Sequence, residues 1–506
     1  MESTRIANFN CDSVQSIPAS SGYAGHALDI LQTAHQALEK GDFELAFETL
    51  EKGARSSRDP RITAICDLEM AGIYTLYGRE GIEGSSQSLS NAVLSNPLLR
   101  QNPTYMALRA SNIAFTLELE AFEVGERIAD SEPRRMRALE LAAQSRGGTS
   151  VAKFHAVSAL VTLGEPETAL ELLDGIVLEE LPAFLRWRYW SWRGGALEGL
   201  SRWREAEQAY SHGADLTSGT DKAALLMDQA AMLLELEEPF EALITLEQVA
   251  GLYNNLEPAL EAASRLHLEA RAHLALDNPS LARERAELAR ALEDEVGEPS
   301  FGVALVHGQS LAAMADMPGA LAAFSRAVQL APAADKSYAL HEMGLAQMDA
   351  GLPEESRGSL NAALLDNEYP YKAEVLADLA ELEYRLGDFD ATERQATLAL
   401  EAGAIIPASL LLANIAYEYY RLDDALEHYN RVLEFAPEAS RDWVLAHQMI
   451  ADTLVQLGWR EPNRILYHAQ IALPHLEPSD EWAVTLEGYI AKANTLLGSS
   501  GGRTLN

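Results

Sequence analysis

The sequence contains little cysteine and no long apolar run. Its 506 residues include two cysteines, Cys11 and Cys66, which are too few for a disulfide framework, so we expect a reducing compartment. No stretch approaches about 18 consecutive apolar residues, the length that a membrane-spanning helix needs. The first 25 residues hold one basic residue and no apolar segment typical of a signal peptide. We therefore expect a cytoplasmic protein without membrane insertion.

Positive charge is also scarce. Lysine and arginine number 39 against 76 aspartates and glutamates, which gives a formal net charge of −37. Phosphates and anionic lipids attract basic surfaces, so this balance argues against direct binding to nucleic acid or membranes. Two interpretations of the acidic excess stay open: a well-solvated surface, or attraction to a basic partner. Arginine far exceeds lysine, and with much alanine and leucine this bias is associated with GC-rich bacterial sources.

Helical periodicity dominates what remains. Apolar residues recur at steps of three and four, and glycine, proline, aspartate or asparagine interrupts them about every 12 to 18 residues. No segment shows the alternating, β-branched pattern of a strand. With 48% hydrophobic residues the chain can bury apolar surface along most of its length. We therefore predict an all-α protein.

The clearest repeated unit comprises residues 301–332, in which two helical segments flank a turn. Small and aromatic residues mark the predicted helix crossing and are, in order, Gly308, Ala320, Phe324 and Ala327. The two helix backbones can approach closely where these side chains are small. Pro332 then ends the second helix, because proline lacks an amide donor and clashes with the preceding turn.

This unit resembles the tetratricopeptide repeat (TPR), in which a small residue, an aromatic residue and a proline follow in this order. One marker residue per crossing gives the spacing: Ala46, Ser85, Ala169, Ala206, Ala242, Ala282, Ala320, Ser356, Thr392, Ala425 and Asn463. From Ala169 onward, the intervals range from 33 to 40 residues, against about 34 for a bare repeat. The resemblance covers most of residues 27–497. It implies about eleven or twelve helix pairs in a TPR-type α-solenoid, a right-handed superhelix of antiparallel helix pairs.

The repeats divide the chain into five predicted segments. These are a flexible N-terminal arm (1–25), degenerate TPR-like repeats (26–146), a regular TPR superhelix (147–480), a C-terminal capping helix (481–498) and a flexible tail (499–506). The pattern does not define the repeat register between residues 86 and 146.

The resemblance implies a concave groove lined by the first helix of each pair. Helical spacing from the crossing places candidate partner-binding residues on these helices: Arg188, Ser191, Trp192, Glu198, His267, Arg271, His341, Glu381, Tyr384, Asn414, Tyr417, Gln448 and Asp452. This lining has no dominant charge. It also lacks the paired lysine and asparagine with which chaperone-binding TPR domains hold a terminal carboxylate, which disfavours that co-chaperone role.

Residues 185–193 are unusual because they contain three of the seven tryptophans and three arginines. Arg188 and Trp192 are four residues apart, so they can form a cation–π pair on one helix face. Arginine and tryptophan are enriched in binding hot spots. The alternative is that Trp187 and Trp190 belong to the core, and both interpretations stay open.

Catalytic motifs are missing from the sequence. The loose glycine series at 78, 81 and 84 lacks the lysine and hydroxyl residue of a phosphate-binding loop, and no His-Glu-x-x-His occurs. We expect no enzyme, no cofactor and no metal site, and predict a non-catalytic scaffold or adaptor that binds a peptide, helix or protein surface in the groove. The alternative is a peptide- or ligand-sensing regulatory module that acts through a separate output protein. The partner and the oligomeric state are not defined by the sequence.

Overall fold

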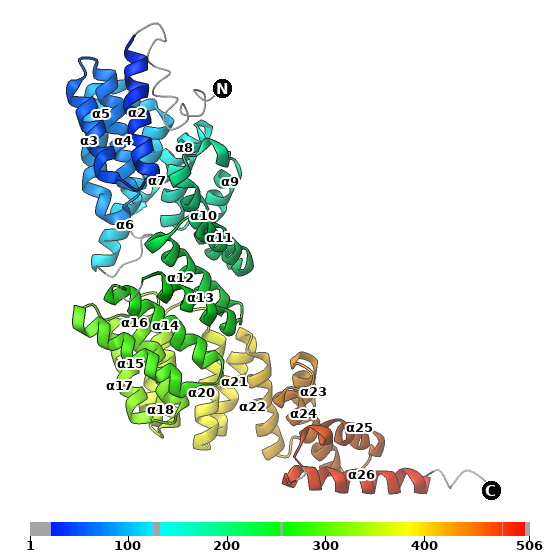
Figure 1. The fold of residues 1–506 in the computed structure, drawn as a ribbon. Coiled ribbons are helices and arrows are strands. Elements are labelled where there is room, and N and C mark those ends of the chain that lie inside the picture. Colours follow the sequence, from blue (N-terminus) through cyan, green and yellow to red (C-terminus); the bar gives the residue numbers. More distant parts are fainter. Residues whose placement is uncertain (1–21, 125–131, 254–256, 478, 501–506) are drawn as a thin grey trace. The chain divides into compact units, whose positions relative to one another are not determined.

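The computed structural model describes residues 22–124, 132–253, 257–477 and 479–500 (Figure 1). These residues form 25 α-helices, α2 to α26, with short 3-10 segments and no β-strand. The predicted all-α class is therefore confirmed. Most of the predicted arm, most of the predicted tail and Cys11 lie outside the described residues.

The chain divides into two compact units, residues 1–314 with 332–334 and residues 315–331 with 335–506. The helices of the first unit are α2 (Gly22–Glu39), α3 (Phe43–Ser56), α4 (Pro60–Thr75), α5 (Ile82–Ser95), α6 (Pro103–Val124), α7 (Glu132–Gln144), α8 (Ser150–Thr162), α9 (Pro166–Asp174), α10 (Ala183–Glu198), α11 (Trp203–Asp215), α12 (Gly219–Glu235), α13 (Pro239–Leu252), α14 (Ala259–Ala275), α15 (Pro279–Val296) and α16 (Phe301–Ala313). Those of the second unit are α17 (Met317–Leu330), α18 (Lys336–Asp349), α19 (Pro353–Ala363), α20 (Lys372–Leu386), α21 (Phe389–Ala402), α22 (Ile405–Glu418), α23 (Leu422–Phe435), α24 (Arg441–Gln456), α25 (Pro462–Ala472) and α26 (Glu481–Ser500). The 3-10 segments are η2 (Gly78–Gly81), η3 (Pro97–Gln101), η5 (Ser145–Gly147), η6 (Leu178–Glu180) and η7 (Leu473–His475).

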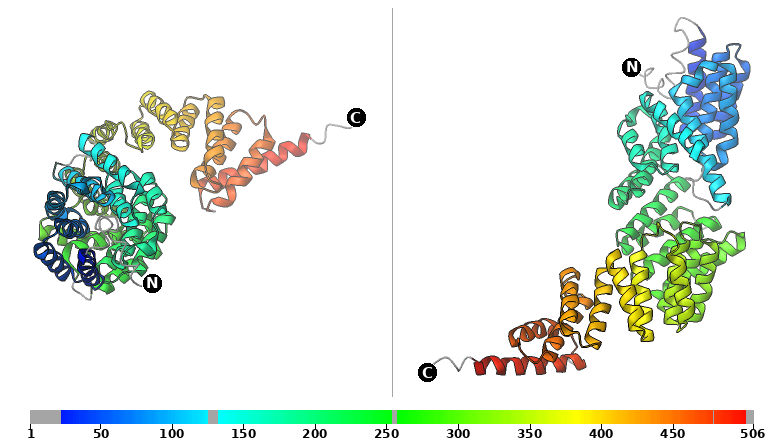
Figure 2. Two further views of the ribbon diagram at one scale, coloured as in Figure 1. Left: turned by 90° about the horizontal axis from the view of Figure 1, so that it is seen from above. Right: turned by 180° about the vertical axis from the view of Figure 1, so that it is seen from behind.

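Within each unit, consecutive helices lie side by side as antiparallel pairs, and each pair packs mainly on its neighbours (Figures 1 and 2). In the first unit α10 pairs with α11 and α12 with α13, and in the second unit α20 pairs with α21 and α22 with α23. The last helix, α26, packs on α24 and α25. Such stacking of helix pairs is a TPR-type α-solenoid, the predicted fold class.

A left-handed residue reverses the chain between the two helices of most pairs. In ten turns a residue of positive φ stands five positions before the marker residue, as Gly164 does before Ala169. In eight of these turns the next amide donates to a carbonyl five residues back, for example from Glu238 to Leu233 at 2.9 Å. This is the Schellman closure, which satisfies carbonyls that the helix end leaves free.

Burial of the marker residues tests the spacing predicted from the sequence. Ten of the eleven are at most 1% exposed, which confirms them as crossing residues. Asn463 is exposed, so that marker is wrong, and Ile465 is the fully buried residue of α25. The reason is the longer turn before α25, where Gly458 and Trp459 both adopt positive φ.

Small residues allow the predicted close approach of the paired helices. A Cβ atom on Gly194 of α10 would lie 2.5 Å from the ring of Tyr210 on α11. A Cβ atom on Gly344 of α18 would lie 2.8 Å from the Leu360 side chain on α19. The glycines are therefore required by packing, since real Cβ atoms do not approach a neighbour so closely.

The first helices of the N-terminal pairs pack against one another as well as against their partners. All residues of α4 from 64 to 73 are buried, and so is every residue of α8 from 150 to 160 except Lys153. The hydroxyl of Thr75, at the end of α4, lies 3.4 Å from Nδ1 of His155 on α8. These two first helices therefore contribute to the core with nearly all of their surface.

The apolar core differs between the units. In the first unit one cluster of buried residues extends from Met106 to Val249, whereas the clusters of the second unit each join only neighbouring helix pairs. Within the described residues, no helix combines the length and the apolarity needed to cross a lipid bilayer.

Candidate functional site

The structure corrects the predicted cation–π pair on α10. The guanidinium carbon of Arg188 lies 4.1 Å from the centre of the Trp187 ring and not over Trp192. Side chains on a helix lean toward its N-terminus, and Nη1 of Arg188 accordingly donates to the Phe184 carbonyl at 3.4 Å. Trp192 is instead half-buried against the core of the first unit.

Arg188 is half-buried and forms no ion pair with any carboxylate in the described part of the chain. Burial lowers the pKa of Arg188, and the negative charge of Asp221 on α12 and the hydroxyl of Tyr77 after α4 act in the opposite direction. Arginine stays protonated at neutral pH in such surroundings. Arg188 is therefore a partly desolvated cation near residues from two other helix pairs.

Glu198, at the end of α10, accepts a hydrogen bond from the Tyr210 hydroxyl at 2.8 Å. Nearby on α12, Asp228 is accessible to solvent but crowded by protein, and this desolvation, with the added charge of Glu198, raises the pKa of Asp228 to about 7. Ser191 is half-buried on the same helix as Glu198. Two carboxylates thus lie near each other, one at the end of α10 and one in the middle of α12.

The two candidates on α14 already contact other helices of the first unit. Nη2 of Arg271 forms an ion pair with Glu235 of α12 at 2.8 Å. His267 faces α16, since a Cβ atom on Gly302 would lie 3.2 Å from its ring. Burial, assisted by the charge of Arg271, lowers the pKa of His267 to about 4, so the imidazole is neutral at physiological pH.

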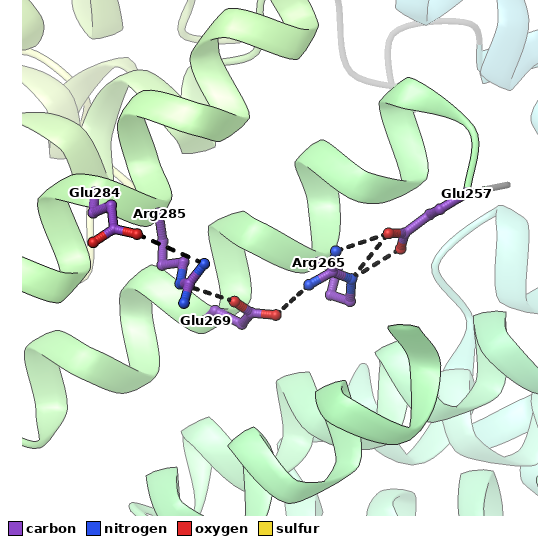
Figure 3. A network of polar contacts seen from close by, with 5 residues as sticks. All are labelled: Glu257, Arg265, Glu269, Glu284 and Arg285. Atoms are coloured by element: carbon purple, nitrogen blue, oxygen red, sulfur yellow. Dashed lines mark hydrogen bonds and ion pairs between the residues drawn. The ribbon is translucent and has the colours of Figure 1, made fainter. Parts of the chain in front are cut away.

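A network of ion pairs holds α14 and α15 (Figure 3). Arg265 donates to Glu257 at 2.7 to 3.2 Å and also binds Glu269, which in turn lies 3.3 Å from Arg285. The side chains of Arg265, Glu257 and Glu269 are each at most 14% exposed. Hydrogen bonding to Glu257 is the main reason why the pKa of Arg265 is raised. The network fixes the start of α14 through Glu257.

In the second unit, His341 on α18 is buried in a polar contact with the next first helix. Its Nε2 lies 2.6 Å from a carboxylate oxygen of Asp378 on α20, and its Nδ1 lies 3.2 Å from the hydroxyl of Tyr369. Both ring nitrogens therefore have partners within the protein. This predicted groove residue joins two repeats.

The candidates on α20 are less buried than His341. Glu381 pairs with Arg385, one turn further on the same helix, at 2.9 Å. The ring of Tyr384 packs against Phe389, with a centroid separation of 5.7 Å. Glu381 and Tyr384 are both half-exposed.

Asp452 is the centre of a buried cluster at the C-terminal end of the second unit. It is 7% exposed and accepts hydrogen bonds from the hydroxyls of Tyr417 on α22 and Tyr489 on α26. Burial and this carboxylate raise the pKa of both tyrosines. The cluster links the first helices of two pairs to the last helix.

Of two further candidates in this region, Asn414 is half-buried and Gln448 is buried. Oδ1 of Asn414 accepts a hydrogen bond from the fully buried Tyr429 hydroxyl at 2.7 Å. Gln448 is 5% exposed. Asn414 therefore joins the two helices of one pair, α22 and α23, and Gln448 is buried on α24.

Contacts between successive first helices recur at the repeat interval. Arg271 bonds Glu235, Arg385 bonds Asp349, and the Tyr420 hydroxyl bonds the Gln456 carbonyl, each across 36 residues. Five of the thirteen predicted groove residues thus contact a neighbouring repeat within one unit: His267, Arg271, His341, Tyr417 and Asp452. Arg188 is the candidate whose charge remains without a carboxylate partner in the described residues.

Sequence reasoning missed the polar residues of α12. The interval between the markers Ala206 and Ala242 is 36 residues, and the same step from Ser191 leads to Met227, beside Asp228. Extending the spacing to this repeat would have found Met227 and Asp228. It would also have found Asp221, which lies about two helical turns before Asp228. Among the described residues, no three or more His, Cys, Asp or Glu side chains are arranged to hold a metal ion.

No protein-family model and no curated protein matches the sequence. Among solved structures, the chain is similar to one from the crystal structure of the APC/C hetero-tetramer Cut9-Hcn1, with 14% identity and a TM-score of 0.41 over 95% of this chain and 98% of that chain. It is also similar to the C-terminal part of a TPR repeat-containing protein from Cytophaga hutchinsonii, with 16% identity and a TM-score of 0.35 over 51% of this chain and 98% of that chain.

Proposed function

We propose that this protein is a non-catalytic scaffold that binds a protein or peptide partner along the first helices of its repeats, with Arg188 and Trp187 of α10 at the centre of the contact. Stacked helix pairs present an extended row of side chains suited to a peptide or a helix. Arginine on an aromatic ring is a frequent element of binding hot spots.

One observation supports this proposal most directly. Arg188 is a partly buried cation stacked on an indole, without an ion pair among the described residues. Removing water from a charge costs free energy unless hydrogen bonds or an opposite charge replace it. A carboxylate or carbonyl oxygen of a partner would supply that replacement.

The test is capture of a partner by the full chain. We expect that crosslinking in the source lysate recovers a protein partner with the unmodified chain, and that Arg188→Gln reduces its recovery at least about fivefold because the charged contact is lost. The melting temperature should stay within about 2 °C, since glutamine keeps the aliphatic stem on Trp187.

Arg193 provides the matched control. It lies on the same helix but forms an ion pair with Asp174 at 2.8 Å. Arg193→Gln should leave partner recovery unchanged. Equal losses in both variants, undiminished recovery with Arg188→Gln, or no partner for the unmodified chain would each contradict the proposal.

A further inference from the structure

A cavity of about 510 Å³ opens between α12, α13 and α14 of the first unit. Its size lies within the range of about 300 to 1,000 Å³ that is usual for ligand sites. Met227, Val249 and Leu260 supply an apolar lining, and Val249 is 1% exposed. We call this cavity the α12–α14 pocket.

Two carboxylates border the pocket, Asp221 of α12 and Glu261 of α14, and Tyr253 also lines it. Neither carboxylate forms an ion pair or a side-chain hydrogen bond in the described residues. This contrasts with Glu257, four residues before Glu261, whose carboxylate is occupied by Arg265 (Figure 3). The pocket thus combines an apolar interior with two carboxylates that form no direct ion pair among the described residues, and Arg188 of α10 acts on Asp221 through its charge alone.

Helix electrostatics alone does not explain this arrangement. Both carboxylates lie in the first turn of a helix, where negative charge is favourable. Glu241, in the first turn of α13, satisfies the same preference but does not line the pocket. The cavity between the carboxylates is the feature that requires a separate account.

We infer that the α12–α14 pocket receives an arginine or lysine side chain of the protein partner, an inference that rests on the proposed scaffold function. The aliphatic part of such a side chain fits against Met227 and Leu260, and its charged end reaches Asp221 and Glu261. A carboxylate accepts charge-assisted hydrogen bonds from guanidinium or ammonium groups. The net charge of −37 favours the approach of a basic segment.

The pocket can be tested with small probes on the full chain. Methionine methyl groups are labelled with ¹³C, and the Met227 signal is assigned with Met227→Leu. The probe is acetyl-Gly-Arg-Gly-amide, and the matched peptide carries citrulline, a neutral isostere of arginine. We expect a saturable shift of the Met227 signal with the arginine peptide, and at least about tenfold weaker binding of the citrulline peptide because the charge is missing.

Substitutions then assign the charge contact. Asp221→Asn combined with Glu261→Gln should weaken binding of the arginine peptide about tenfold or more, whereas Glu241→Gln should not change it. If circular dichroism shows that the double variant does not fold, the charge contact is tested with the two single variants. The comparison of the arginine and citrulline peptides on unmodified protein tests it independently. Equal binding of both peptides, no shift of Met227, or no effect of the substitutions overturns the inference.

Spermidine distinguishes a peptide side chain from a free polyamine. Saturation of the Met227 shift by spermidine at concentrations below those of the arginine peptide would overturn the assignment to a protein partner and favour a ligand-sensing module. Failure of the pocket differs from failure of the scaffold function. If a partner is recovered through Arg188 but no probe binds, only the inference about the pocket is contradicted. If a probe binds but no partner is captured, the proposed scaffold function is contradicted.

Discussion

The pairs α8–α9 and α12–α13 share one local fold but use their first helices in different ways. In both pairs the crossing residue is fully buried, Ala169 in one and Ala242 in the other, and a left-handed residue stands five positions before it. In α8 nearly every residue is core, whereas α12 leaves Asp221 and Met227 half-exposed beside a cavity. The repeat therefore requires small buried residues on the side of a first helix that faces its partner helix. The residues on the opposite side differ between repeats and are buried in α8 but partly exposed in α12.

Composition explains this difference. The sequence of α8 is mostly apolar, and its few polar residues do not form a polar face, as expected for a helix enclosed by others. In α12, Asp221 and Asp228 are seven residues apart and lie on one face. Carboxylates on that face cannot be enclosed by neighbouring helices without a large desolvation cost.

The largest expected effect comes from removing core volume. Phe154 of α8 is 1% exposed, so Phe154→Ala should reduce the free energy of unfolding by about 3 to 5 kcal/mol. Met227 borders the open pocket, and Met227→Ala should cost only about 1 kcal/mol. Urea unfolding followed by circular dichroism measures both variants. Similar losses would show that the two helices are enclosed alike.

A buried carboxylate gives the second comparison. Asp67 of α4 is 5% exposed, and burial raises its pKa from 3.8 to about 6. The folded state therefore holds a proton that the unfolded state releases, and stability is lost as the pH rises from about 4 to 6. Asp67→Asn should stabilise the protein at pH 7 by about 2 to 3 kcal/mol.

The same experiment at lower pH checks the sign. The advantage of Asp67→Asn should largely disappear by pH 4, where the aspartate is protonated in the folded protein. Burial lowers the pKa of His155 to about 3, which gives the opposite pH trend, but His155 is present in both proteins and cancels in the difference. Asp221→Asn, on the open helix, should change stability by less than about 1 kcal/mol. An Asp67→Asn advantage that does not depend on pH would contradict the burial argument.

The turns give the smallest effects. Gly164, in the α8–α9 turn, has φ of +73° and open space around its Cα, so Gly164→Ala should cost about 1 kcal/mol through backbone strain alone. Glu237, at the equivalent place in the α12–α13 turn, has φ of 58°, and Glu237→Gly should gain about 0.5 kcal/mol after the entropy cost of glycine. Denaturant unfolding should therefore show changes of opposite sign in the free energy of unfolding of the two variants. Equal signs would show that side-chain contacts outweigh the backbone at these turns.

The sequence was sufficient to predict the repeats. Small residues at the helix crossings are separated by an almost constant interval, and close packing requires them, as Gly194 against Tyr210 illustrates. The marker failed at Asn463 because two left-handed residues lengthen the preceding turn, and only one of them is glycine. A tryptophan in this conformation leaves no local signal, since the tertiary structure imposes it.

The candidate site was less predictable. Spacing along a helix selects the correct face, which is why His341 and Asp452 lie between first helices. Spacing does not show which polar groups are already bonded to the next repeat, because those partners are 35 to 37 residues away. The direction in which Arg188 folds along its helix, toward Trp187, also depends on its surroundings.

Cys66 gives the protein an internal reporter of local opening. It is 1% exposed on α4, and burial, followed by the charges of Glu69 and Asp67, raises the pKa of its thiol to about 12. Alkylating reagents react with thiolates, so modification requires α4 to detach from its neighbours first. The alkylation rate of Cys66 in a Cys11→Ser background therefore measures how often this part of the array opens by local unfolding, without any attached label.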